Sequence, residues 1–140
     1  MTRSAYHPYT QIMYLYTHNL PARYITIAHL LSFMSVRVYD VNMILRDIGN
    51  DWCHTFIYDT SMDVGVLRLK PGDTDPQSPH ANDEIYYIIR GDGFLNIEGK
   101  DIPIREGMVI FVPAKKKHRF HGNKNELIAL YVFAGRDEDV

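Results

Sequence analysis

Three residues with metal-binding side chains stand out in this sequence, namely His80, Glu84 and His118. His80 and Glu84 lie four positions apart, in a polar, turn-rich stretch that leads into an apolar run. His118 follows a second apolar run after a short basic turn. Two imidazoles and one carboxylate are the ligand set of a mononuclear metal site with open coordination positions. The sequence therefore predicts a site for one divalent ion, such as Fe, Zn, Mn, Ni or Cu.

The first two of these residues belong to a regularly spaced stretch. Gly72 is followed after five residues by Ser78, then by His80 and Glu84, and after six further residues by Gly91. This spacing resembles the first cupin motif, in which a glycine precedes His-x-His, a glutamate and a second glycine. Ser78 stands in the place of the first histidine. The resemblance thus implies three protein ligands where the family usually has four.

The stretch that contains the third residue resembles the second cupin motif. Gly107 is followed after five residues by Pro113, and His118 lies five positions beyond that proline. Two positions differ from the family pattern, because Lys115 stands where the motif has a glycine and Gly122 where it has an asparagine. The two motifs nevertheless occur in the expected order.

Together the motifs identify a resemblance to small single-domain cupins of the RmlC-like jelly-roll superfamily, with flanking strands extending it to about residues 55–134. The resemblance implies an all-β fold, a single conical β-barrel (the double-stranded β-helix) with a metal ion inside. It does not imply one reaction, because the superfamily contains dioxygenases, isomerases, epimerases, storage proteins and sensors.

The hydrophobic pattern independently predicts a closed barrel or jelly roll. A short helix is expected over residues 40–49, with Asp40 or Asn42 as its cap and Gly49 as its stop. The apolar run 85–89 has no polar alternation, which predicts a strand covered on both faces. Eight short strands, separated by glycine, proline and polar turns, are predicted near residues 53–58, 64–69, 84–90, 94–97, 102–104, 108–112, 119–121 and 127–133.

Strand alternation suggests which side chains surround the predicted metal. Tyr86 shares the face of Glu84, and Phe120 shares that of His118, so both are predicted to wall a substrate pocket. Gln77 offers an amide oxygen as an additional ligand. These residues complete the set of predicted site residues.

Other polar residues near the motifs allow two interpretations each. His54, on a flanking strand, is either a group that supports the site or a structural histidine. His121 falls on the opposite face from His118, which argues against its being a ligand. The basic turn 115–117 either steers a substrate anion towards the barrel mouth or is simply solvated.

Composition limits the classes of protein and partner. The chain has 140 residues, 46% of them hydrophobic, which suits one domain with a substantial core. Its net charge of −2 favours neither nucleic acid nor an anionic membrane as a partner. Cys53 is the only cysteine, so an internal disulfide is excluded and a cytoplasmic location is expected.

The first 39 residues form an extension that differs from the rest, because they are tyrosine-rich and contain no Asp or Glu. The predicted domains are therefore an N-terminal extension, 1–39, and a cupin barrel, 40–140. Residues 1–33 allow several interpretations: a segment packed on the barrel or on a partner subunit, a weakly ordered tail, an extension upstream of a start at Met34, or a targeting peptide. The run 25–34 is too short to span a bilayer. A tyrosine-rich, apolar extension has surface to bury, so a homodimer is expected.

Two functions remain open from the sequence. The first is an enzyme that uses the metal for dioxygenase-like or isomerase- and lyase-like chemistry on a small oxygenated molecule. The second is a non-enzymatic module that binds a metal or small ligand for storage or sensing. A third interpretation is structural, with His80 and His118 as ordinary histidines and Glu84 as a charge at a strand end.

Overall fold

The computed structural model describes residues 36–135. The chain divides into two units, residues 1–44 and 45–140. Most of the first unit, including residues 1–35 of the predicted extension 1–39, lies outside the described residues, so the predicted division into an extension and a barrel stays a prediction.

A short helix, α2 (Val41–Asp47), precedes the strands. The carboxylate of Asp40 accepts hydrogen bonds from the backbone amides of Asn42 (2.9 Å) and Met43 (3.2 Å), which satisfies free donors at the helix start. Asp40 is therefore the cap, as predicted. Gly49, with a φ of 60°, follows the helix in the left-handed conformation that glycine tolerates. Among the described residues, no helix has the length and apolar character needed to cross a bilayer.

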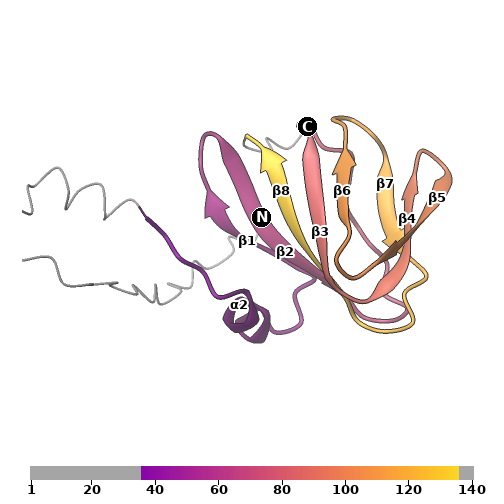
Figure 1. Cartoon of the computed structure of the whole chain (residues 1–140), viewed down its shortest axis with the longest axis horizontal. Helices are drawn as coiled ribbons and strands as arrows, with labels where there is room; N and C mark the ends of the chain where they lie inside the picture. Colours follow the sequence, from indigo (N-terminus) through magenta and orange to yellow (C-terminus); the bar gives the residue numbers. More distant parts are fainter. Residues whose placement is uncertain (1–35, 136–140) are drawn as a thin grey trace, which may run out of the picture. The chain divides into compact units, whose positions relative to one another are not determined.

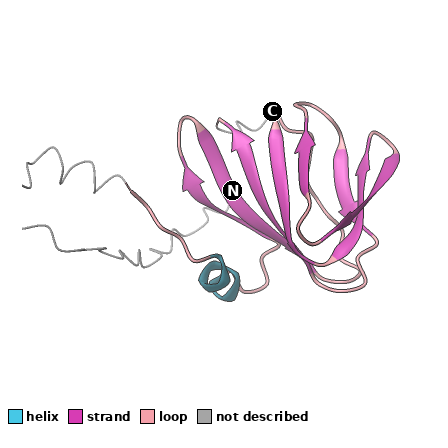
Figure 2. Ribbon diagram, viewed as in Figure 1, coloured by secondary structure: helices cyan, strands magenta, loops and turns pink. Residues whose placement is uncertain are grey.

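The remaining elements are eight antiparallel strands in two sheets (Figures 1 and 2). They are β1 (Cys53–Tyr58), β2 (Met62–Leu69), β3 (Glu84–Arg90), β4 (Asp92–Ile97), β5 (Lys100–Arg105), β6 (Val109–Val112), β7 (His118–His121) and β8 (Leu127–Ala134). One sheet has the order β1-β2-β8-β3-β6 and the other the order β5-β4-β7. The predicted strand bounds agree to within one or two residues, and the all-β jelly roll is confirmed.

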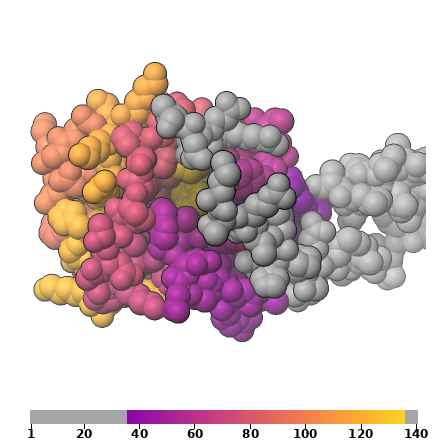
Figure 3. Space-filling view, turned by 180° about the vertical axis from the view of Figure 1, so that it is seen from behind, coloured from indigo at the N-terminus to yellow at the C-terminus, as the bar shows by residue number. Residues whose placement is uncertain are grey.

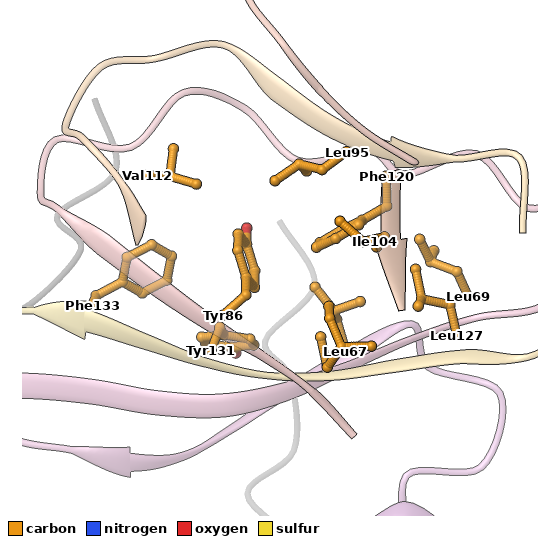
Figure 4. Packing of buried hydrophobic residues seen from close by; sticks show 12 residues of the cluster. Leu67, Leu69, Tyr86, Leu95, Ile104, Val112, Phe120, Leu127, Tyr131 and Phe133 are labelled. Atoms are coloured by element: carbon orange, nitrogen blue, oxygen red, sulfur yellow. The ribbon is translucent and has the colours of Figure 1, made fainter. Parts of the chain in front are cut away.

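The two sheets enclose one hydrophobic core. Its members alternate along their strands, as the pleat requires, and include Tyr86 and Ile88 from β3 and Leu95 and Phe120 from the smaller sheet. Figure 4 shows Tyr86 between Phe133 on one side and Phe120 on the other. Burying each such side chain stabilises the fold by roughly 1.5–3 kcal/mol, so sheet closure is strongly favoured. Seen from behind, residues of the smaller sheet (orange) lie at the opposite end of the barrel from β1 and β2 (magenta) (Figure 3).

One prediction about β3 is wrong. The apolar run 85–89 predicted a strand covered on both faces, but Ile85 is 44% exposed and Tyr87 is 43% exposed. Both side chains point to the outer face of the larger sheet, opposite Phe111 and Val109 of β6, which are also exposed. An antiparallel sheet is stable with one face in solvent, so an unbroken apolar run does not require cover on both sides.

Candidate metal centre

The structure brings the three predicted ligands together from separate elements. His80 lies in the loop before β3, Glu84 is the first residue of β3, and His118 is the first residue of β7. One ligand atom from each residue lies within 4.8 Å of the other two. Glu84 belongs to the larger sheet and His118 to the smaller one, so the site forms only when the two sheets close on each other.

The donor atoms converge on Glu84 at the inner wall of the barrel. Its Oε2 lies 3.1 Å from Nε2 of His118 and 3.5 Å from Nε2 of His80. Glu84 and His118 are buried, whereas His80 is partly accessible. The ring of His80 packs edge-on against Phe133, with centroids 4.5 Å apart, which fixes its orientation.

A backbone contact decides which nitrogen of His118 faces the centre. Nδ1 lies 2.7 Å from the carbonyl oxygen of Lys116 and donates its proton there. In the neutral imidazole, Nε2 then presents a lone pair to the carboxylate of Glu84, and two acceptors at 3.1 Å require a cation or a proton between them. Burial lowers the pKa of His118, but its bonds to Glu84 and Lys116 outweigh this and the pKa is raised overall.

These observations test whether a divalent ion fits the residues present. The site offers two imidazole nitrogens and a carboxylate, whose ligand atoms lie within 4.8 Å of one another. Nε2 of His118 and Oε2 of Glu84 are both buried, and a positive charge between them would stabilise the pair. The Lys116 carbonyl accepts a hydrogen bond from His118 and orients its ring, as a hydrogen-bond acceptor commonly does for a metal-bound histidine. The donor set therefore fits a divalent ion such as Fe, Zn or Mn.

A cavity of about 550 Å³ opens beside the candidate ligands. His80 and Glu84 contribute to its wall, and aromatic side chains line much of the remainder. The other lining residues are Trp52, Cys53, Thr55, Tyr58, Asp63, Leu67, Pro76, Gln77, Ser78, Pro79, Tyr131 and Phe133. This volume suits a small organic molecule.

The comparison with protein families places the fold and motifs in context. The cupin-domain family model matches residues 65–134, which are 70 of the 140 residues of the chain. The chain belongs to the cupin family. This match runs from within β2 to the end of β8 and includes all three candidate ligands of the cupin.

Three curated proteins are similar in sequence to this cupin. An uncharacterized protein of Streptomyces coelicolor is 35% identical over 79 residues, covering 56% of this chain and 75% of the relative. An oxalate-binding protein of Thermotoga maritima is 35% identical over 60 residues, covering 42% of this chain and 50% of the relative. An acireductone dioxygenase of Tuber melanosporum is 39% identical over 54 residues, covering 35% of this chain and 31% of the relative. The cupin thus spans half or less of the two relatives whose names state a function.

Solved structures support the same fold. An RmlC-like cupin of Methanocaldococcus jannaschii with a double-stranded β-helix fold has a TM-score of 0.58 and 21% identity to this cupin. The likeness covers 64% of this chain and 84% of the other. At this identity it bears on the fold alone.

Two residues predicted to wall the pocket, Tyr86 and Phe120, lie in the hydrophobic core and not in the cavity wall. Tyr86 and Phe120 are fully buried and pack at right angles to each other, and neither belongs to the cavity lining. The Tyr86 hydroxyl lies 3.0 Å from Nε2 of His118 and donates a hydrogen bond to Oε1 of Gln77 at 2.7 Å. Burial and the Glu84 carboxylate raise the pKa of Tyr86 well above its usual value, so the phenol keeps its proton. Contact of Tyr86 or Phe120 with a substrate stays a prediction.

Asp75 is a buried residue of the site that the sequence analysis missed. Its carboxylate accepts hydrogen bonds from the side-chain amide of Gln77 (2.5 Å) and the backbone amide of Phe120 (2.8 Å). These bonds tie the loop before β3 to β7, the strand that carries His118. Phe120 lies 45 positions after Asp75 in the sequence, so no local sequence pattern indicates that Asp75 is buried.

The remaining polar residues lie away from the centre. His121 is exposed and bonds to Asp101 at 2.9 Å, which confirms that it faces away from His118. Cys53 and Thr55 line the cavity, so His54 between them points to the other face of β1, and burial lowers its pKa. The side chains of the basic turn 115–117 are exposed and do not belong to the cavity lining.

Proposed function

We propose that this cupin is a metal-dependent enzyme that acts on a small oxygenated molecule. The divalent ion is held by His80, Glu84 and His118, and the substrate occupies the adjoining cavity. The observation that carries the proposal is the convergence of three ligand atoms within 4.8 Å beside a cavity of about 550 Å³. The reaction is dioxygenase-like, or else an isomerisation or lyase reaction.

In this proposal the metal ligands, the cavity residues and Tyr86 have separate roles. A divalent ion, when bound, polarises a substrate oxygen or activates a bound small molecule such as water or dioxygen. Glu84 and the two histidines use only part of the shell of such an ion, which leaves positions for substrate. Tyr131 and Phe133 contribute aromatic surface to the cavity wall, against which an apolar part of a substrate can pack. The Tyr86 hydroxyl oxygen lies beside Nε2 of His118, and its proton is donated to Gln77.

The likeness to an acireductone dioxygenase supports the oxygen-dependent form of this proposal. That likeness covers 54 residues, which is less than a third of the relative, so the substrate of that enzyme is not transferred to this chain.

A second candidate function is non-enzymatic binding of a small oxygen-bearing ligand. The likeness to an oxalate-binding protein, 35% over 60 residues, favours it. Such a module would use the same three ligands and leave the bound molecule unchanged.

One experiment separates the two functions. Protein reconstituted anaerobically with Fe²⁺ or Zn²⁺ is mixed with phenolic, thiol and keto-acid compounds, and oxygen uptake and product formation are followed. We expect turnover of at least one class by the wild type and none by His118→Ala. Metal-dependent binding of oxalate or a related acid, without turnover of any compound, would favour the binding module instead.

A further inference from the structure

The side chain of Gln77 bridges the buried Asp75 and the candidate metal centre. Gln77 is itself buried, with 8% of its surface exposed. Its Nε2 lies 2.5 Å from Oδ2 of Asp75, while its Oε1 lies 2.7 Å from the Tyr86 hydroxyl and 3.3 Å from Nε2 of His80. One end of the amide therefore contacts a carboxylate, and the other end faces the ligand atoms.

The hydrogen bonds fix which end is the oxygen. An ionised carboxylate only accepts hydrogen bonds, so the amino group of Gln77 must face Asp75. The Tyr86 hydroxyl donates to the opposite end, which also requires an oxygen there. Two independent partners thus point the Gln77 oxygen into the metal centre.

Asp75 is held firmly enough to impose this orientation. It is 2% exposed, and it accepts hydrogen bonds from the backbone amides of Phe120 (2.8 Å) and Gln77 (3.1 Å) besides the side chain of Gln77. Phe120 lies two positions after His118 on β7, so one strand positions both the imidazole and the carboxylate. A binding group is held in a precise position when packing and hydrogen bonds from neighbouring residues lock its side chain.

The neighbouring Ser78 does not provide such a donor. Ser78 is exposed, and a serine hydroxyl is a poor ligand for these ions. We infer that the side-chain oxygen of Gln77 is the fourth protein donor of the metal centre, and that Asp75 is the residue that positions it. This inference rests on the proposed metal centre and adds a carbonyl oxygen to its two nitrogens and one carboxylate.

The test compares variants that separate the oxygen of Gln77 from its amino group. Gln77→Leu removes both groups, whereas Gln77→Glu keeps an oxygen for the metal but loses the donor to Asp75. In the double variant Asp75→Asn with Gln77→Glu, an amide at 75 donates to a carboxylate at 77, which restores this bond with its direction reversed. The amide nitrogen then replaces the oxygen that accepts from the Phe120 amide, so Asp75→Asn alone, in which an amide also replaces the carboxylate, is the reference for the double variant. Asn96→Leu is the matched control, since Asn96 also donates its amide to an aspartate, Asp101, but away from the centre.

The dissociation constant for Zn²⁺ is measured by competition with a chelator, and circular dichroism checks that each metal-free variant is folded. We expect Gln77→Leu to bind Zn²⁺ about 10- to 100-fold more weakly than the wild type. The double variant should bind more tightly than Asp75→Asn alone, because its carboxylate at 77 is held towards the metal, and Asn96→Leu should be unchanged. Asp75→Asn alone should weaken binding, because the Gln77 amide is then free to turn.

Each contrary result has a distinct meaning. A wild type that binds no Zn²⁺ would overturn both the proposed function and this inference. If His118→Ala loses Zn²⁺ while Gln77→Leu binds it as the wild type does, the metal centre stands and the Gln77 assignment is wrong. If the double variant binds Zn²⁺ no more tightly than Asp75→Asn alone, Gln77 supports the loop only and is not a donor.

Discussion

The ring of Tyr131 on β8 crosses over Gly65, its partner on β2, and its hydroxyl bonds to Thr55 on β1 at 2.6 Å. A Cβ atom on Gly65 would collide with the Tyr131 ring and with the backbone carbonyl of His54. The absence of a side chain at 65 thus lets one tyrosine span three strands. Tyr131 also lines the cavity, so this contact shapes the candidate site.

Replacing Gly65 with alanine should therefore destabilise the barrel. We expect Gly65→Ala to lower the free energy of unfolding by about 1–3 kcal/mol, measured by chemical denaturation, because Tyr131 must leave its place. The control is a double-mutant cycle with Tyr131→Ala, which removes the ring. Relief should be partial, since the His54 carbonyl remains. Equal costs of Gly65→Ala with and without the ring would show that Tyr131 is not the obstacle.

The metal assignment predicts the composition of the purified protein. We expect about one divalent ion per chain by elemental analysis, and a loss of most of it in His80→Ala and in His118→Ala, because each removes one of three ligands. His121→Ala is the matched control, as this histidine is exposed and bonded to Asp101. Undiminished metal in both ligand variants would contradict the assignment.

Bound metal should also stabilise the folded chain. At a free metal concentration a thousand times the dissociation constant, we expect about 4 kcal/mol of added stability, seen as a higher melting temperature that a chelator reverses. His118→Ala should show no such response to the chelator. An equal response in this variant would place the stabilising ion elsewhere.

Cys53 should react slowly with thiol reagents. Burial, with Asp51 and Asp75 nearby, raises the pKa of its thiol from 9.0 to about 11. At pH 8 the folded protein then holds about a hundredfold less thiolate than the unfolded chain, so alkylation by iodoacetamide should be slower by a similar factor. The rate should keep rising to about pH 11.

The raised pKa of Cys53 also predicts how the stability of the fold changes with pH. Because the pKa is raised on folding, the contribution of the neutral thiol is intact below pH 9.0 and is lost as the pH rises towards about 11. Denatured protein is the control for alkylation, and equal rates in the folded and denatured states would contradict the shift.

We also expect a homodimer. Ile85 and Tyr87 of β3 pair with Phe111 and Val109 of β6 to form an exposed apolar surface on an edge of the larger sheet. A two-fold symmetric dimer would bury this surface against its own copy. Light scattering should give twice the mass of one chain, and Phe111→Arg should shift it to one chain. Ile102→Arg, on the other sheet, is the control. A monomeric wild type would contradict this prediction.

Much of the local structure follows from residues that are neighbours in the sequence. Glycine, proline and polar turns delimit the strands, because turn formation and strand alternation depend on near neighbours. The same alternation correctly placed Glu84 and Tyr86 on one face of β3, and the structure shows that this face is the buried one. The resemblance to the two cupin motifs implied that His80, Glu84 and His118 share a site, and the structure brings these residues together.

Contacts between residues far apart in the sequence depend on how the two sheets pack. Exposure of Ile85 and Tyr87 depends on what covers the outer face of the sheet, which the apolar run itself does not specify. The bond between Asp75 and the Phe120 amide joins residues 45 positions apart, and it exists because sheet closure brings β7 against the loop before β3. That closure aims the oxygen of Gln77 inward, since the direction of a side-chain amide is set by the partners that surround it in space.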